Sequence, residues 1–282
     1  MKNEALENGE FIIDSHRGAF KGGLLENSIP AFLEALDEGA NVLECDIRRT
    51  KDDNIVLVHN STIDHIAKNA TFTPDVQEFG EEPVGKVRDH TVDYLKALKY
   101  ENDASILTLE EFLHLLRDKK VGAQIELKEF GFEKQIITML EGLDIDHDDL
   151  KGPIVFTSFN WFAILKLQKL LWKTNLPKHD FFNKKKGFCA GLQAIPLGSF
   201  IGKWVLRQCK KNKIWGFMTY YKYLPISRIE YAHQCGVKFC PRVPDNEELI
   251  KSYINANVDG FETDNVPLIK KCITDEGYQF DG

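Results

Sequence analysis

Short apolar, strand-like runs alternate with helical patterns along the whole of this 282-residue chain. The strand candidates are residues 11–14, 41–48, 55–59, 121–127, 154–158, 188–195, 215–220, 237–241 and 259–262. Helical patterns lie between them, for example at 30–36, 109–117, 161–171, 225–235 and 246–256. Such alternation indicates an α/β fold, a parallel sheet with helical crossovers. Because no repeat and no Pro- or Ser-rich linker interrupts it, the sequence favours a single domain over residues 1–282.

One connection between strands is too short to hold a crossover helix. Only residues 48–54 lie between Ile47 of the second strand candidate and Ile55 of the third. These two strands are therefore predicted to form an antiparallel hairpin. A turn centred on Asp52-Asp53 would bring His59 roughly opposite Asp46. The region from about residue 50 to 105, which is rich in Pro, Gly and acidic residues, is interpreted as an insertion on the rim of the sheet.

The composition excludes several classes of protein. With 43% apolar and 28% charged residues, the chain is neither disordered nor collagen-like. A net charge of −7 argues against a dedicated nucleic-acid surface. None of the six cysteines forms a C-x-x-C pair, so reduced, mostly buried thiols are expected. The polar N-terminus lacks the apolar core of a signal peptide, and no apolar run reaches the ~18 residues of a membrane span. A cytoplasmic location without a transmembrane segment is the expectation.

Charged residues alternate with apolar ones on two strand candidates. Because every second residue of a strand faces the same side, Glu44 and Asp46 point together, and so do Glu126 and Lys128. Inward-facing charges cost several kcal/mol unless they are paired or bound to a metal. Three carboxylates are hard oxygen ligands that suit Mg²⁺ or Ca²⁺. Structural ion pairing, such as Glu126 with Lys128 or Arg48, is the alternative interpretation.

Two histidines follow strand candidates that lead toward the same end of the sheet. His16 and Arg17 come directly after the first strand, and His59 ends the hairpin strand. Active sites of barrel enzymes lie at the carboxyl ends of the strands. Imidazoles titrate near neutral pH and can act as general acid and general base. Arg17 and Lys128 offer cations for a phosphate group.

These residues belong to an ordered series of short motifs. The series comprises His16-Arg17-Gly18, Glu26-Asn27-Ser28, Glu44-x-Asp46, Thr50-Lys51-Asp52, His59, Ile125-Glu126-Leu127-Lys128, Thr157-Ser158-Phe159 and Gly260-Phe261-x-Thr263-Asp264. It resembles the signature of the glycerophosphodiester phosphodiesterase family over about residues 11–270. The resemblance implies a (β/α)₈ TIM barrel with a small insertion after the second strand, and metal-dependent hydrolysis of glycerophosphodiesters such as glycerophosphocholine and glycerophosphoethanolamine to sn-glycerol 3-phosphate and an alcohol.

The resemblance also implies roles for individual residues. Glu44, Asp46 and Glu126 match the family's ligands for one divalent cation, Mg²⁺ or Ca²⁺. His16 and His59 match the catalytic histidines, and Arg17 and Lys128 match the cations that contact the substrate phosphate. The residues leave open which histidine is the acid, and whether water or a substrate hydroxyl attacks the phosphorus.

Three positions depart from the family pattern. Asn60 stands where members usually have Asp after the second histidine, and His65 stands where they usually have Arg. The seventh strand of members normally ends in Trp-Thr-Val-Asn, whereas this chain reads Phe239-Cys240-Pro241-Arg242-Val243, so the Trp is lost and Arg242 adds a cation near the mouth. A contact of Arg242 with an anionic headgroup is one hypothesis. A surface ion pair of Arg242 is the other.

Two other functions stay open at this stage. The segment 198–211 mixes apolar and basic residues and could contact a membrane surface and admit lysophospholipids, although a helix packed on the barrel explains it as well. A lysophospholipase D is therefore one alternative, and a weakened phosphodiester-binding barrel is another. The partner expected in every case is a small phosphodiester, and the oligomeric state is open. Four aromatic residues are predicted to line the pocket, namely Tyr220, Tyr221, Tyr223 and Phe261.

Overall fold

The computed structural model describes residues 2–67, 71–72, 84–100, 104–143, 152–178, 187–192 and 200–280. Eight of its strands form a parallel sheet in the order β8–β7–β6–β2–β1–β11–β10–β9. They are β1 (Ile12–Ser15), β2 (Val42–Arg49), β6 (Gly122–Leu127), β7 (Ile154–Thr157), β8 (Phe188–Ala190), β9 (Gly216–Tyr220), β10 (Lys238–Arg242) and β11 (Gly260–Thr263). The two ends of the sheet meet where Leu192 bridges Phe217 beyond β8. The sheet is therefore a nearly closed barrel, and the predicted TIM-barrel fold is confirmed.

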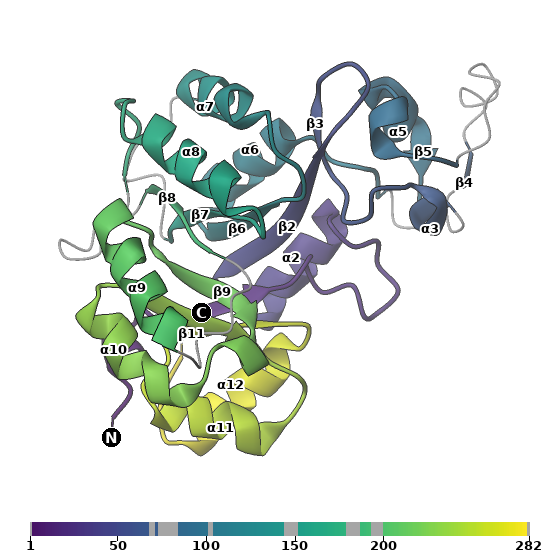
Figure 1. Cartoon of the computed structure of the whole chain (residues 1–282). Helices are drawn as coiled ribbons and strands as arrows, with labels where there is room; N and C mark the ends of the chain where they lie inside the picture. The colour runs from purple at the N-terminus through teal and green to yellow at the C-terminus, as the bar shows by residue number, and fades with distance from the viewer. Residues whose placement is uncertain are drawn as a thin grey trace.

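Helices alternate with the strands and lie around the barrel (Figure 1). The described helices outside the insertion are α1 (Glu4–Glu7), α2 (Ile29–Glu38), α6 (Leu109–Lys119), α7 (Glu133–Gly142), α8 (Trp161–Leu171), α9 (Phe200–Asn212), α10 (Ile229–Gln234), α11 (Glu247–Asn255) and α12 (Val266–Asp275). Two 3₁₀ turns, η4 (Tyr221–Tyr223) and η5 (Ile226–Arg228), precede α10. The helix predicted over 225–235 is thus split, and the strand predicted over 188–195 ends at residue 190, with 193–199 outside the described residues.

The sequence determines the first crossover helix clearly. Ser28 is the N-cap of α2 and accepts a hydrogen bond from the backbone N–H of Ala31. Pro30 lies in the first turn, where a missing N–H does no harm. Gly39 ends the helix with a φ of 103°, a left-handed conformation that favours glycine. These three residues set the ends of the helix that was predicted at 30–36.

Two layers of apolar side chains hold the barrel together. On β2, Leu43, Cys45 and Ile47 face outward into the core beneath the helices, as the alternation predicts. A second cluster lies inside the barrel. Its members are Ile12, Val42, Val155, Cys189, Trp215, Met218 and Cys240. All six cysteines are free and buried, which confirms their expected state. Helix α9, part of the segment suspected of membrane contact, buries Val205, Leu206 and Cys209 in the main core, so packing explains its apolar side.

The insertion lies beside the barrel, outside its wall (Figure 1). Its described elements are β3 (Ile55–Leu57), α3 (Asp64–Ala67), β4 (Thr71–Phe72), η1 (Val87–Asp89), α5 (Val92–Ala97) and β5 (Leu98–Lys99). They enclose a separate apolar cluster that includes Val58, Ile63 and Leu95. Strand β3 pairs antiparallel with β2 and with no other strand of the barrel sheet, so the predicted hairpin is confirmed.

The predicted register of this hairpin is wrong by one residue. Ile47 pairs with Leu57, which places Val58 opposite Asp46, where His59 was expected. The turn is centred on Asp52 alone, because Asp53 adopts a left-handed φ of 61° and the Thr50 side chain closes the loop on Asn54. His59 lies beyond the paired residues, so the shift leaves its side chain close to the site described below.

A buried ion-pair network under α10 should make the stability of the barrel depend on pH. His233 Nε2 lies 2.7 Å from Asp259 Oδ2, and Lys238 Nζ lies 2.8 Å from Oδ1. Burial alone would lower the pKa of His233, but the hydrogen bond and charge of Asp259 outweigh it and raise the pKa. A histidine whose pKa is raised in the folded state stabilises that state at pH values below the ordinary histidine pKa. This stabilisation is lost as the pH rises through the raised pKa.

We therefore expect His233→Gln to destabilise the protein by about 1 kcal/mol near pH 6 and by less near pH 9. Urea unfolding of both proteins at the two pH values measures this difference. Gln234→Ala, on the same short helix, is the control. An equal loss at both pH values would contradict the predicted linkage.

Candidate active site

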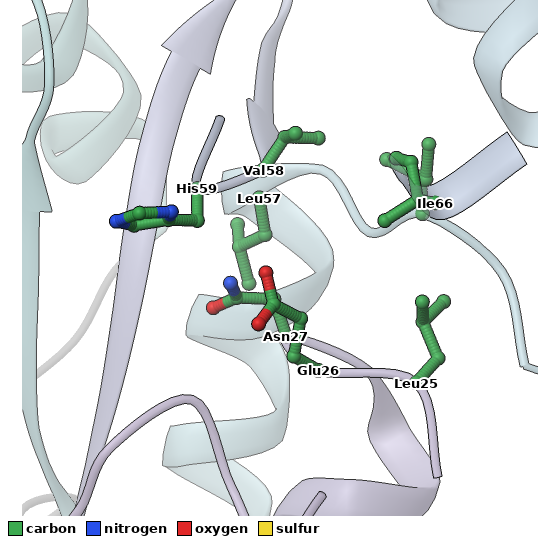
Figure 2. A pocket seen from close by; sticks show the side chains of 8 residues that line it. Leu25, Glu26, Asn27, Leu57, Val58, His59 and Ile66 are labelled. Carbon is green, nitrogen blue, oxygen red and sulfur yellow. The ribbon is translucent and has the colours of Figure 1, made fainter. Parts of the chain in front are cut away.

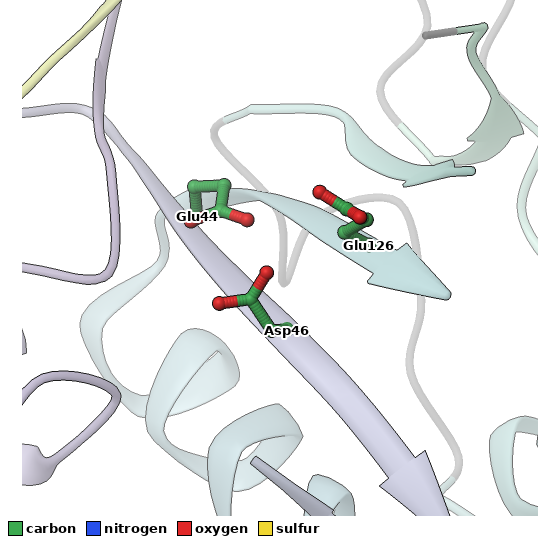
Figure 3. Close-up of side chains that lie close together, drawn as sticks. All are labelled: Glu44, Asp46 and Glu126. Carbon is green, nitrogen blue, oxygen red and sulfur yellow. The ribbon is translucent and has the colours of Figure 1, made fainter. Parts of the chain in front are cut away.

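Three buried carboxylates meet inside the barrel near the carboxyl ends of two neighbouring strands. Glu44 and Asp46 come from β2, and Glu126 comes from β6 (Figure 3). One carboxylate oxygen of each residue lies within 4.8 Å of the others. The register of the strands explains the meeting, because Asp46 pairs directly with Glu126 and Glu44 is two residues away on the same face.

Two cations lie against this cluster. Lys128 Nζ is 2.9 Å from Asp46 Oδ1 and 2.5 Å from Glu126 Oε1. Arg17 Nε is 3.0 Å from Asp46 Oδ2. The ion pair between Glu126 and Lys128, which the sequence left open as an alternative to a metal site, is therefore present. The other suggested partner of Glu126, Arg48, instead pairs with Glu129 at 3.0 Å.

The charges of the cluster are unevenly compensated. Burial raises the pKa of Asp46, but the charges of Lys128 and Arg17 outweigh burial and lower it. For Glu44, burial and then the neighbouring carboxylates, Asp46 first, raise the pKa well above its ordinary value. Two cations thus leave Glu44 in a carboxylate-rich, buried place. A divalent cation would relieve this crowding, and an all-oxygen donor set of this kind suits Mg²⁺ or Ca²⁺.

A tight turn directly after β1 places Arg17 at the cluster. Arg17 has a φ of 58° and Gly18 a φ of 79°, both left-handed. The backbone N–H of Arg17 donates to Glu44 Oε2 at 3.0 Å. A Cβ on residue 18 would lie 2.7 Å from the backbone of Ala31, so only glycine fits there. The turn thereby links the first strand to the metal-ligand candidate on the second.

His16 comes directly after β1, the strand beside β2, and is held through both ring nitrogens. Its Nδ1 is 2.7 Å from Asp264 Oδ1, and its Nε2 is 2.9 Å from Nη1 of Arg242. Arg242 Nη2 also donates to Asp264, at 3.2 Å. Burial raises the pKa of Asp264, but His16 and Arg242 outweigh it and lower the pKa to about 2. Asp264 is therefore ionised at neutral pH beside the imidazole.

His59 has a different hydrogen-bond partner. Its Nδ1 lies 2.8 Å from the Asn60 side-chain oxygen, and its backbone carbonyl accepts hydrogen bonds from the Arg48 guanidinium at 2.9 and 3.0 Å. Burial lowers the pKa of His59, and the positive charges of Lys128 and Arg17 act in the same direction, against the attraction of Asp46. The neutral imidazole is therefore favoured at His59.

This arrangement of side chains accompanies a match over most of the chain. The sequence pattern of the glycerophosphoryl diester phosphodiesterase family matches residues 16–268. The chain belongs to this family. It is accordingly a phosphoric diester hydrolase with a TIM-barrel fold.

Relatives and solved structures are similar over nearly full length. A glycerophosphodiester phosphodiesterase of Caldanaerobacter subterraneus subsp. tengcongensis is 26% identical over 92% of this chain and 98% of its own length. The structure of one from Thermotoga maritima is 26% identical, with a TM-score of 0.61 over 92% of this chain and 97% of that chain. An Oleispira antarctica phosphodiesterase in complex with the product sn-glycerol-3-phosphate has a TM-score of 0.72 at 19% identity, covering 95% and 99% of the two chains. This last likeness concerns the fold alone.

A small hollow opens beside His59 in this phosphodiesterase. Figure 2 shows Glu26 and Asn27 between His59 on one side and Leu25 and Ile66 on the other. The walls of the hollow are the loop before α2, the end of β3 and the insertion. The Glu26 carboxylate pairs with Arg17 Nη1 at 3.0 Å and lies 3.7 Å from His65 Nε2. The hollow therefore combines apolar walls with one acidic side chain.

Several site residues were not predicted from the sequence, and one was predicted in the wrong place. Asn27 donates to Asp46 at 3.2 Å, and Asp264 holds His16, yet neither was assigned a role from the sequence. Because the last strand of a closed barrel lies beside the first, the position of Asp264 after β11 was a signal for its meeting with His16. The prediction that Phe261 lines the pocket is wrong. Phe261 packs outward, 5.8 Å from the Phe11 ring, because its neighbour Glu262 takes the inward position.

The three tyrosines that were predicted, together with Phe261, to line the pocket lie at the carboxyl end of β9. Tyr220 and Tyr223 are exposed, and Tyr221 packs partly against the main core.

No helix in the described parts of the chain is long and apolar enough to cross a membrane.

Proposed function

We propose that this phosphodiesterase hydrolyses glycerophosphodiesters to sn-glycerol 3-phosphate and an alcohol, with glycerophosphocholine and glycerophosphoethanolamine as the first candidates. The observation that carries the proposal is the convergence of three buried carboxylates, two cations and two histidines at the carboxyl ends of neighbouring strands. The product named for the Oleispira antarctica relative belongs to the same reaction. A single domain and a cytoplasmic location stay predictions.

Glu44, Asp46 and Glu126 would hold one divalent cation, Mg²⁺ or Ca²⁺. When bound, the cation supplies positive charge against the negative charge that develops on the phosphate oxygens. Arg17 and Lys128 flank the same place and would bind the phosphate, Arg17 through its planar fork and Lys128 as a point charge. Both side chains now pair with Asp46, so phosphate binding would exchange part of these ion pairs for substrate contacts.

The two histidines have different hydrogen-bond partners. The ionised Asp264 carboxylate lies on Nδ1 of His16 and holds its ring in place. The neutral amide of Asn60 and the burial of His59 favour its neutral form. We therefore assign His59 as the general base that deprotonates the attacking oxygen, and His16 as the general acid that protonates the leaving alcohol. The Nε2 of a protonated His16 is a donor, so the Arg242 guanidinium has to turn away from it at that stage.

The direct test is turnover of glycerophosphocholine and glycerophosphoethanolamine by the purified protein, with glycerol 3-phosphate as the measured product. Release is expected with Mg²⁺ or Ca²⁺ and should stop on addition of EDTA. His16→Ala is the control for contaminating activity. Lysophosphatidylcholine is included as a further substrate. Turnover of that lipid alone would replace this proposal by lysophospholipase D activity, and metal binding without any turnover would indicate a binding protein.

Arg242 is proposed to contact an anionic group on the leaving alcohol. About a third of its side chain is exposed (34%), at the end of β10 beside His16. Arg242→Ala is therefore expected to lower kcat/KM about tenfold more for glycerophosphoserine, which carries a carboxylate, than for glycerophosphocholine. Arg207→Ala, an exposed arginine on α9, is the matched control. An unchanged ratio of the two substrates would leave Arg242 with an ion-pairing role alone.

A further inference from the structure

Three phenylalanines are the most exposed large apolar side chains in the described part of the molecule. Phe162 is 85% exposed, Phe130 70% and Phe159 61%. Single exposed apolar residues are common on proteins, but a group of them at one place marks an interaction surface. We refer to Phe130, Phe159 and Phe162 as the phenylalanine rim.

The phenylalanine rim borders the mouth of the active site. Phe130 lies two residues after Lys128 in the loop that follows β6, and Phe159 lies in the loop that follows the neighbouring strand β7. Glu126 pairs with Thr157 across these strands, so the two loops begin side by side. The Ser158 hydroxyl donates to the carbonyl of Leu127 at 2.8 Å and ties the loops together. The rim is thus connected to the strands that carry Glu126 and Lys128.

Core packing does not explain the outermost member of the rim. Helix α8 buries Ala163, Ile164, Leu167 and Leu171 against the barrel. Phe162 lies on the opposite face of this helix, in line with Lys166 and Lys169 at helical spacing, and all three are exposed. The face that α8 turns to solvent therefore begins with an aromatic residue at the catalytic end and continues with lysines.

The segment that carries Phe159 and Phe162 is positively charged, whereas Phe130 lies between Glu129 and Glu133. Residues 158–178 contain four lysines and no aspartate or glutamate, in a chain whose net charge is −7. One of them, Lys166, pairs with Glu133 at 2.6 Å on the neighbouring helix α7. Exposed aromatic side chains next to lysines are typical of surfaces that bind anionic lipid headgroups while the rings enter the interface.

We propose that the phenylalanine rim docks the catalytic end of the barrel onto an anionic phospholipid bilayer. The rings of Phe130, Phe159 and Phe162 would enter the headgroup region, and Lys169 would meet the lipid phosphates. Docking in this orientation would bring the site mouth to the membrane surface. The proposal goes beyond the proposed function, since it concerns where the enzyme works and not which bond it breaks. It also uses a surface different from segment 198–211.

The test is co-sedimentation of the full-length protein with vesicles of phosphatidylcholine and phosphatidylglycerol, and with vesicles of phosphatidylcholine alone. Binding is expected to the anionic vesicles and to weaken with added salt. The triple variant Phe130→Ser, Phe159→Ser, Phe162→Ser should bind at least about tenfold more weakly, because each ring contributes apolar area. Trp172→Ser removes an exposed aromatic residue from the other end of α8 and should bind as the unmodified protein does.

Turnover of glycerophosphocholine by the same variants separates docking from catalysis. The rim residues take no part in the proposed chemistry, so the triple variant should keep its rate on this water-soluble substrate, which also shows that it is folded. Failure of the unmodified protein to bind anionic vesicles would overturn the docking proposal and leave the proposed function standing. So would equal binding by the triple variant, or a dimer in size-exclusion chromatography that the triple variant loses, because the rim would then cover a second copy.

Discussion

Glu44→Gln is expected to abolish turnover while the metal-free protein becomes slightly more stable. Loss of the charged ligand removes the bound cation, whose action on a phosphoryl group accounts for several kcal/mol, so kcat should fall about a thousandfold or more. Without metal, burial and neighbouring carboxylates raise the pKa of Glu44, and its ionised form is disfavoured in the fold. A neutral amide avoids that penalty and should stabilise the metal-free protein by about 1 kcal/mol at neutral pH.

Thermal unfolding with and without Mg²⁺ or Ca²⁺ checks both parts. The Tm of the unmodified protein should rise when the ion is added, because binding to the folded state alone stabilises it. The Tm of Glu44→Gln should start higher and should not respond to the ion. Glu230→Gln, on the surface of α10, should follow the unmodified protein. A metal-dependent Tm in Glu44→Gln would remove Glu44 from the proposed ligand set.

Replacing either histidine by alanine is expected to reduce turnover of glycerophosphocholine by about a hundredfold to ten-thousandfold, the usual contribution of general acid or base catalysis. The two variants should differ on a substrate whose leaving group needs no proton. A 4-nitrophenyl phosphodiester releases a stable phenolate, so loss of the general acid matters little for it. His16→Ala should therefore recover much of its rate on this ester, and His59→Ala should not.

Which of the two variants recovers its rate on the nitrophenyl ester decides which histidine is the general acid. Recovery by His59→Ala alone would exchange the two roles. Recovery by neither variant would mean that both imidazoles act before the leaving group departs. Asp264→Asn provides a further check, because it removes the negative charge of the carboxylate that contacts His16 Nδ1 and leaves the ring in place. It should lose most of its activity on glycerophosphocholine and retain it on the nitrophenyl ester.

Much of the barrel was predictable because local patterns decide it. The alternation on β2 predicted that Glu44 and Asp46 face inward, and the short link to residue 55 predicted the hairpin. Capping residues marked α2 at both ends. In each case the information lies within a few residues of the element it describes.

Details that depend on distant contacts were not predictable to the same extent. The hairpin register depends on the left-handed φ of Asp53, and the outward packing of Phe261 depends on which side of β11 the barrel turns inward. The three carboxylates were predicted to converge, but the ion pairs of Asp46 with Arg17 and Lys128 arise only when three segments come together. The roles of these residues in catalysis remain predictions that the variants above test.

The contact between His16 and Asp264 also bears on how the protein is made. The two residues are separated by 248 positions, yet they meet because β11 lies between β10 and β1 in the sheet. A ribosome therefore releases His16, the proposed general acid, long before it synthesises the carboxylate that holds it. Until β11 is added, β1 has an unpaired edge and the proposed proton donor lacks its partner Asp264. Activity should thus begin only when the last strand has joined the sheet, so the newly made chain cannot cleave phosphodiesters while it is still being translated.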